Sequence, residues 1–230
     1  MLIPQKLQYK LLYNYNNQKS IAMKGVLYKW DELDENLEPK HFNKKIVLKI
    51  PFQILLNPEL SLNEKLLLGL DFSLINKLGF NQMSHIEVGK LLSLHPNIVG
   101  SCRRSLIKKG LLIKKGKSYT ISVDFSSMME GHDLSSLDKR DIKIPFEIYN
   151  NNDLKTGEKL LWGEYNSISK GYRYYFAKRE HAAKRLAVSV ESVSNWTKSL
   201  YEKGLFKEYK LEAGYCTHQR KIVTVVFNQD

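Results

Sequence analysis

Two short stretches of the chain combine an apolar stripe with polar side chains that can hydrogen-bond to a ligand. In residues 96–109 and 190–203, apolar residues recur three and four positions apart, which predicts helices with one buried face. Asparagine can pair with the edge of adenine and arginine with that of guanine, while small residues allow close approach to a groove. The residues of the two stretches that we expect to meet such a ligand are Asn97, Gly100, Ser101, Arg103, Arg104, Ser192, Ser194, Asn195 and Lys198.

Basic residues cluster beside both stretches. Residues 111–123 predict two short strands around a basic glycine turn, and residues 205–227 predict a second hairpin. Between them, residues 171–179 mix aromatic rings, which we expect to pack inward, with cations that face outward. Cations placed in this way suit phosphate groups, which contribute affinity without sequence information. The cations concerned are Lys114, Lys115, Lys117, Arg173, Lys178, Arg179, Arg220 and Lys221.

The chain contains an internal repeat. The hexapeptide at residues 49–54 recurs with one substitution at residues 143–148, a shift of 94 positions (143 − 49). The same shift holds without a gap through residues 64–67 and 109–111. So many matches in one register indicate a duplication, and the period is far too long for a solenoid repeat. Each copy should therefore be a small complete domain.

Each copy predicts three helices followed by a hairpin. Serine and glutamate three positions apart, at residues 61–64 and 84–87, have the spacing of a capping box and mark two helix starts. Pro96 suits the first turn of a third helix, and Gly110 suits the left-handed residue that ends it. Three helices and a basic hairpin make a winged helix. The fold class expected is mainly α with small β wings (α+β), as two winged helix-turn-helix domains in tandem.

Charge follows the same division. Both copies are basic, whereas the segment between them is acidic and rich in serine and aspartate, which is typical of a linker. The expected organisation is an N-terminal extension at 1–46, a first domain at 47–125, a linker at 126–141 and a second domain at 142–230. The extension has three alternative readings: a dimerisation arm, a DNA-contacting arm, or an extra layer on the first domain.

Bulk composition narrows the partners and the compartment. The net charge of +12 and the isoelectric point near 9.5 favour a negatively charged partner. No apolar run approaches the roughly 20 residues that cross a bilayer, and no secretion signal precedes the first copy, so no membrane partner is expected. Two cysteines, Cys102 and Cys216, argue against a disulfide framework and suit the cytoplasm.

Signals of catalysis are missing from the sequence. The histidines are scattered, and Cys216 and His218 have no second ligand pair at zinc spacing, so no metal site is expected. There is no phosphate-binding glycine-lysine loop and no nucleophile with a base at a recognisable spacing. We therefore expect neither an enzyme nor a cofactor.

The second copy also carries a family resemblance. Its matching residues are Ile144, Pro145, Phe146, Glu147, Ile148, the helix motif at 154–161, the stretch 183–189, Ser192, Val193, Ser194, and the ending at 200–206. On these residues it resembles the winged helix-turn-helix domains of plasmid replication proteins and related regulators of bacterial mobile elements. Residues 49–113 match more loosely and depart from the pattern at 94–96. The resemblance implies a DNA-binding module.

These observations lead to one expected function and two alternatives. The expected function is sequence-specific binding of double-stranded DNA, at two related half-sites roughly one helical turn or more apart, by a transcriptional regulator of a mobile element. The first alternative is a plasmid-type replication initiator that binds origin repeats. The second is a non-catalytic interaction module of a replication or recombination complex. Further candidate partners are a second copy of the chain, as a homodimer, and the replication or transcription machinery.

Overall fold

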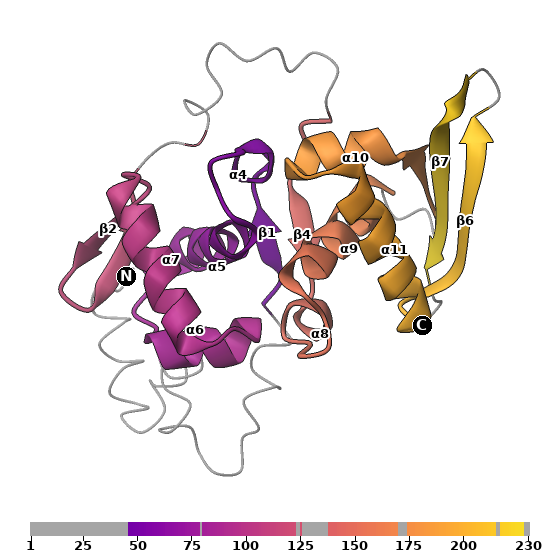
Figure 1. Ribbon diagram of the computed structural model, residues 1–230. Helices are drawn as coiled ribbons and strands as arrows, with labels where there is room; N and C mark the ends of the chain where they lie inside the picture. Colours follow the sequence, from indigo (N-terminus) through magenta and orange to yellow (C-terminus); the bar gives the residue numbers. More distant parts are fainter. Residues whose placement is uncertain are drawn as a thin grey trace, which may run out of the picture.

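The computed structural model describes residues 46–78, 80–122, 125, 138–169, 174–214 and 217–227. Within these residues the fold is mixed α+β, with helices and small antiparallel sheets (Figure 1). None of the helices in this part of the chain has the length and apolar character needed to span a bilayer. The predicted N-terminal extension, apart from Ile46, and the predicted linker up to residue 137 lie outside the described residues.

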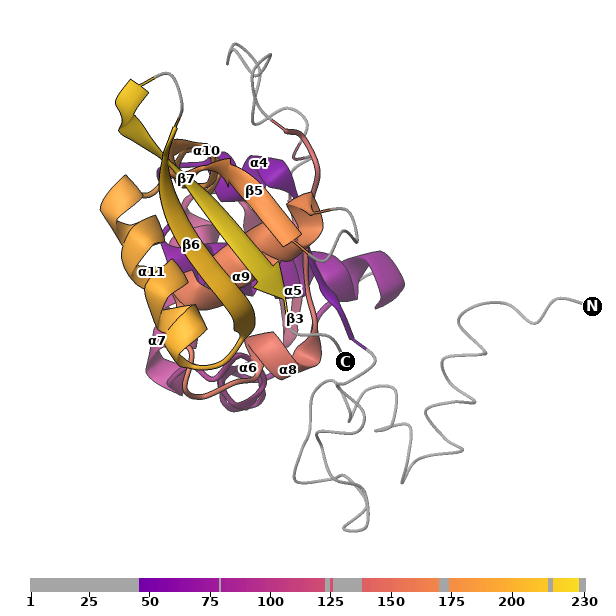
Figure 2. The same ribbon diagram turned by 90° about the vertical axis from the view of Figure 1, so that its right-hand side faces the viewer.

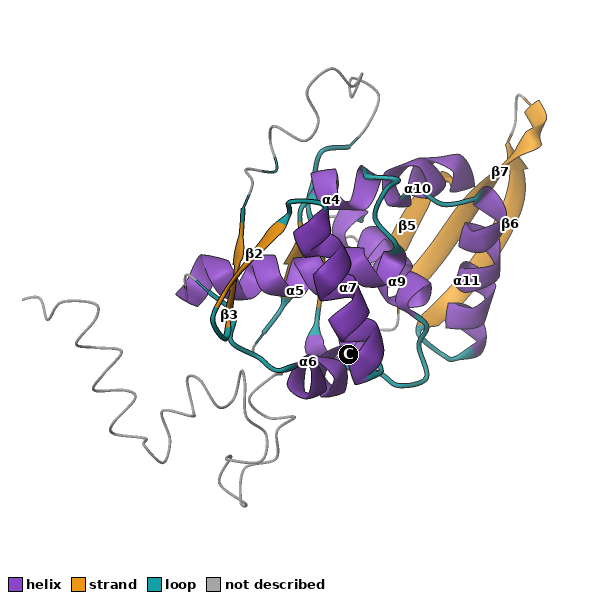
Figure 3. Ribbon diagram, turned by 60° about the vertical axis from the view of Figure 1, so that its left-hand side comes forward, coloured by secondary structure: helices purple, strands orange, loops and turns teal. Residues whose placement is uncertain are grey.

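The first half of the described chain consists of one strand, four helices and a two-stranded hairpin. Its elements are β1 (Leu48–Ile50), α4 (Phe52–Leu56), α5 (Leu62–Leu78), α6 (His85–Leu92), α7 (Pro96–Lys108), β2 (Leu112–Lys115) and β3 (Ser118–Ile121). Helices α6 and α7 pack together, and α7 also packs on α5. Strands β2 and β3 form an antiparallel hairpin, which Figure 3 shows beside α5.

The second half repeats this order. Its elements are β4 (Ile142–Ile144), α8 (Phe146–Tyr149), α9 (Thr156–Ile168), β5 (Tyr174–Lys178), α10 (Arg179–Leu186), α11 (Val190–Glu202), β6 (Phe206–Gly214) and β7 (Thr217–Phe227). Strand β4 and helices α8, α9, α10 and α11 each start 94 positions after their counterparts in the first half, as α11 at Val190 does after α7 at Pro96. Strand β5 adds an edge to the β6–β7 hairpin. At the corresponding position of the first half, Asn81 makes only an isolated bridge to Tyr119.

The helix boundaries follow from local capping residues. The backbone N–H of Ser84 donates to the Glu87 carboxylate over 2.6 Å while the Ser84 hydroxyl accepts from the Glu87 backbone, which confirms the predicted capping box. Pro96 lies in the first turn of α7, as predicted. Gly110 has φ of 71°, the left-handed conformation expected at this helix end.

Strands β1 and β4 join the two halves. Lys49 lies opposite Lys143 in this antiparallel pair, flanked by Leu48 opposite Ile144 and Ile50 opposite Ile142. Lys143 is the counterpart of Lys49 under the repeat shift, so the pairing is symmetric about these two residues. A local twofold axis therefore passes between them. Close packing accompanies it, because a Cβ on Gly69 would lie 2.4 Å from Ile50 Cγ1, and one on Gly163 would lie 2.6 Å from Ile144 Cγ1.

Buried apolar residues from both halves form one continuous core. Two buried lysines cross this junction: Lys65 Nζ donates to the carbonyl of Leu186, and Lys159 Nζ donates to that of Leu92. Helices α5 and α9 also meet, where the Thr156 hydroxyl donates to the side-chain oxygen of Asn63 over 2.6 Å. The two halves thus pack on each other through strands, helices and polar contacts.

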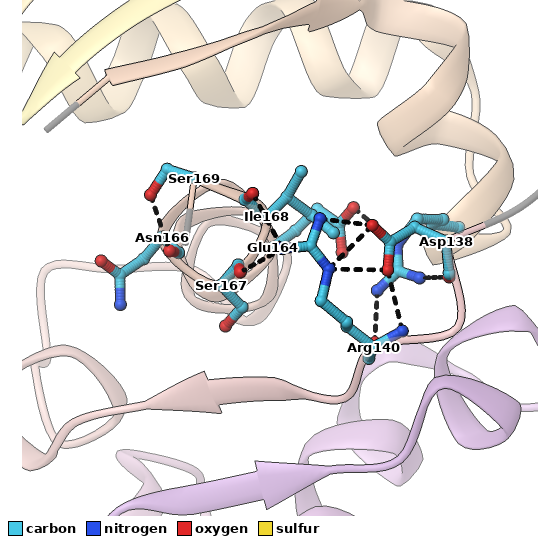
Figure 4. A network of polar contacts seen from close by, with 8 residues as sticks. Asp138, Arg140, Glu164, Asn166, Ser167, Ile168 and Ser169 are labelled. Carbon is cyan, nitrogen blue, oxygen red and sulfur yellow. Dashed lines mark hydrogen bonds and ion pairs between the residues drawn. The ribbon is translucent and has the colours of Figure 1, made fainter. Parts of the chain in front are cut away.

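The last residues of the predicted linker are held against the second half. Arg140 Nε donates to Asp138 Oδ1 over 2.8 Å, and its Nη1 reaches the Ile168 carbonyl at the end of α9 over 3.1 Å (Figure 4). Arg185 Nε donates to the buried carboxylate of Glu164 over 2.7 Å, and its Nη2 donates to the Arg140 carbonyl over 2.7 Å. Residues 138–141 therefore belong to the packed body.

Candidate nucleic-acid interface

Helices α7 and α11 lie on one side of the molecule. Both face the viewer in Figure 1, and both lie toward the left in Figure 2, after a turn of 90°. Each follows a shorter helix across a tight turn whose first residue is left-handed, with φ of 55° at Ser93 and 52° at Ala187. In each half, a tight turn thus joins a shorter helix to a longer one that follows it.

The polar face of α7 is open to solvent. Val99, Cys102 and Leu106 are buried, as the spacing predicted. Asn97, Ser101 and Arg104, by contrast, are exposed. The start of α7 is capped by His95, whose Nδ1 accepts from the Asn97 backbone N–H over 3.2 Å.

Arg103 does not belong to this exposed face, so its predicted role as a DNA contact is wrong. Its side chain is buried, with the residue only 1% exposed. Its Nη1 donates to the Met83 carbonyl over 2.7 Å, and its guanidinium stacks 3.9 Å from the Tyr119 ring centroid. Asp71 lies 4.0 Å from its Nη2. Arg103 therefore ties α7 to the core.

Gly100 is likewise buried, and its predicted place on the DNA-facing surface is wrong. A Cβ at this position would lie 3.0 Å from His85 Nδ1, so the glycine lets α6 and α7 approach each other. The repeat shift maps Gly100 to Ser194 and His85 to Arg179. There, the Arg179 guanidinium donates to the Ser194 hydroxyl. These two predicted DNA contacts are thus bound to each other at the α10–α11 junction.

Helix α11 presents the second polar face. Val193 and Leu200 are buried beneath it, whereas Asn195 and Lys198 are exposed and Ser192 is half-buried. The Ser189 hydroxyl caps the helix by accepting from the Ser192 backbone N–H over 3.1 Å. Lys198 lies 3.7 Å from Glu202 one turn later, in an exposed ion pair that water screens.

The two faces differ in chemistry at each outward position. The shift aligns Ser101 with Asn195 and Arg104 with Lys198. It also aligns Ile98, which is 40% exposed, with Ser192. The sequence prediction named small and hydrogen-bonding residues and therefore missed Ile98, although an exposed aliphatic side chain at the start of α7 suits a thymine methyl group. The two helices therefore expose different side chains at corresponding positions.

The hairpin of the first half carries exposed cations. Strand β2 pairs with β3 from Leu112, opposite Ile121, to Lys115, opposite Ser118. Gly116 makes the turn with φ of 60°. The predicted strands and turn are confirmed. Lys114, Lys115 and Lys117 are all exposed around this turn.

The corresponding cations of the second half are described only in part. Lys178 is exposed at the start of α10. Arg173 lies outside the described residues, and so do the side chains of Arg220 and Lys221 in β7. Among the described rings at 174–176, the predicted inward packing holds only for Tyr175, which is buried. Tyr174 is 54% and Phe176 61% exposed, because alternate residues of a strand face opposite sides.

Comparison with protein-family models, with curated proteins and with solved structures gives no match. The described residues contain no group of three or more histidine, cysteine or acidic side chains that is arranged to hold a metal ion. What the surface offers is hydrogen-bonding side chains on two exposed helices and cations beside them.

Proposed function

We propose that the chain consists of two winged helix-turn-helix units related by duplication, and that it binds double-stranded DNA in a sequence-specific way. Helix α7 enters the major groove at one half-site and α11 enters it at another, while the basic hairpin of the first unit contacts phosphates. The observation that carries this proposal is the placement of α7 and α11 on one side of the molecule, each with its polar face uncovered.

Charge supports the proposal. The chain carries a net charge of +12, and exposed cations lie on α7, α11 and the β2–β3 turn. Cations that neutralise phosphates release counterions from DNA, so binding should weaken steeply with added salt. The resemblance of residues 144–206 to domains of plasmid replication proteins and mobile-element regulators points to the same partner. We assign the chain to transcriptional regulation of such an element, because a symmetric pair of reading helices suits an operator.

The proposal is tested by fluorescence anisotropy with labelled duplexes between about 50 and 200 mM salt. The wild-type protein should bind, with affinity that falls steeply as salt rises. Arg104→Glu and Lys198→Glu should each weaken binding by about tenfold or more, since each puts repulsive charge into a groove. Lys139→Glu is the charge-matched control, because Lys139 is exposed in the segment that packs at the end of α9. Equal effects of all three changes would contradict the proposal.

A further inference from the structure

Two lysines that have no part in the proposed DNA contact are buried at the junction of the two halves. Lys65 and Lys159 are each only 1% exposed, and the repeat shift makes them counterparts. Neither lysine forms an ion pair with any of the described residues. Burial lowers the pKa of each to about 8. An ammonium group removed from water needs compensating partners, and here backbone carbonyls supply them.

Each lysine bridges the two halves with the same geometry. Lys65 Nζ donates to the Leu55 carbonyl of its own half over 2.6 Å and to the Leu186 carbonyl of the other half over 2.7 Å. Lys159 Nζ donates to the Tyr149 carbonyl of its own half and to the Leu92 carbonyl of the other, both over 2.8 Å. The shift converts each set of contacts into the other, so the exchange is reciprocal.

The carbonyls reached across the junction have a specific place in the fold. Leu92 is the last residue of α6, and Leu186 is the last residue of α10. Each directly precedes the left-handed residue that turns the chain into α7 or α11. A cation at a helix C-terminus satisfies the free carbonyls there and is attracted by the helix dipole. We call α7 and α11 the outer helices. Each lysine therefore contacts the other half at the turn that sets the orientation of that half's outer helix.

We propose that Lys65 and Lys159 are positioning residues that act crosswise, with Lys65 orienting α11 and Lys159 orienting α7 for DNA. This inference rests on the proposed function. It assigns to each half a determinant of specificity in the opposite half, and this determinant is a buried lysine that does not itself contact DNA. Loss of either ammonium leaves two carbonyls without their donor and releases the turn before one outer helix only.

The test compares Lys65→Met and Lys159→Met, which remove the charge and keep the length of the side chain. The half-sites are first assigned with two single variants that keep both lysines: the α11 half-site is the one that Asn195→Ala affects, and the α7 half-site is the one that Arg104→Ala affects. Lys65→Met should lower discrimination at the α11 half-site by about tenfold, as expected for the loss of a charged hydrogen bond. Lys159→Met should do so at the α7 half-site. Leu74→Ala, a core change in α5, controls for general destabilisation.

A second measurement needs no DNA. In Lys65→Met, amide hydrogen exchange should speed up at Val188 and Val193. The Val188 N–H closes the turn between α10 and α11, and the Val193 N–H closes the first turn of α11. The amides of Leu94 and Val99 in the other half should keep wild-type rates, and Lys159→Met should show the reverse pattern. If Lys65→Met does not fold, Lys65→Gln, which retains a donor for one carbonyl, replaces it in both measurements.

The outcomes separate the two proposals. Equal effects at both half-sites, or effects on the lysine's own half, overturn crosswise positioning and leave DNA binding intact. Wild-type protein that binds no duplex overturns the proposed function, and the exchange pattern alone then decides whether each lysine holds the opposite turn. Crossed patterns in both measurements support the inference.

Discussion

Lys143 lies directly opposite Lys49 in the antiparallel pair of β1 and β4, and it is also the counterpart of Lys49 in the internal repeat. A residue that faces its own counterpart lies on a twofold axis, as in the self-complementary interface of a symmetric dimer. The single chain thus reproduces the geometry of a dimer. Its two outer helices, α7 and α11, are related by that axis.

Asn195 and Arg104 are predicted to read bases. Replacing either by alanine should relax the preference at one base position, with a loss of about 1–3 kcal/mol for the matched duplex and little loss for a mismatched one. Binding titrations against single-base variants of the target measure this effect. Asn152→Ala, at an exposed position between α8 and α9, is the matched control. A uniform loss over all sequences would assign the residue to phosphate contact instead.

Lys114, Lys115 and Lys117 are predicted to contact phosphates. Alanine at any one of them should weaken binding to all duplexes to a similar extent. It should also reduce the slope of log affinity against log salt by about one, because one fewer counterion is released. Isothermal titration at several salt concentrations gives that slope. An unchanged slope in all three variants would remove the β2–β3 turn from the interface.

Arg103 is predicted to serve stability rather than binding. Arg103→Met leaves the buried carboxylate of Asp71 without its cation and should lower the free energy of unfolding by about 3–5 kcal/mol. The double change Asp71→Asn/Arg103→Met should recover much of this loss. The second half holds an uncharged pair at these positions, Tyr165 and Thr197, whose hydroxyl groups lie 2.8 Å apart. Urea denaturation measures the energies, and a DNA affinity that fell for the folded variant would refute this assignment.

Glu64 is predicted to make the free energy of unfolding depend on pH in the acidic range. Burial raises the pKa of its carboxyl, but hydrogen bonds from Ser105, Lys109 and Ser61 outweigh that effect and lower the pKa to about 2 from its ordinary 4.5. Because the folded pKa is lowered, this stabilisation is fully present above pH 4.5 and is lost as the pH falls toward 2.

The pKa of Glu158, the counterpart of Glu64, is lowered in the same direction, with Lys203 Nζ 2.7 Å from its carboxylate. The change Glu64→Gln/Glu158→Gln should therefore flatten the fall of unfolding free energy below pH 4.5. Chemical denaturation at a series of pH values checks this, with Glu59→Gln at an exposed site as the control. A slope identical to that of wild type would contradict the prediction.

Much of the fold can be predicted from the sequence where the determining residues lie close together along the chain. The capping box of Ser84 and Glu87, the proline at the start of α7 and the glycine turn of the β2–β3 hairpin each act within a few residues. The stripe through Val99 and Leu106 fixes which face of α7 is buried. Repetition of these signals then predicts two similar halves.

The prediction for Arg103 was wrong because the charge of the side chain was given more weight than its position in the helix. Arg103 follows Val99 by four positions and precedes Leu106 by three, so helical geometry already places it on the buried stripe. Its burial depends on Asp71, Met83 and Tyr119, which lie in other elements and leave no local mark.

Contacts between the two halves could not be predicted from patterns of neighbouring residues. Lys65 and Leu186 are 121 residues apart, and nothing near either residue signals their hydrogen bond. A lysine in a helix is ordinarily solvated, so only the assembled junction identifies Lys65 as buried.

Selection of bound duplexes from a random DNA library tests the central claim most directly. The twofold relation between α7 and α11 predicts an enriched site with two half-sites in inverted orientation. The half-sites should differ in sequence, because the positions of Ser101 and Arg104 on α7 are occupied by Asn195 and Lys198 on α11. Enrichment of no sequence, or of half-sites in direct orientation only, would contradict the account.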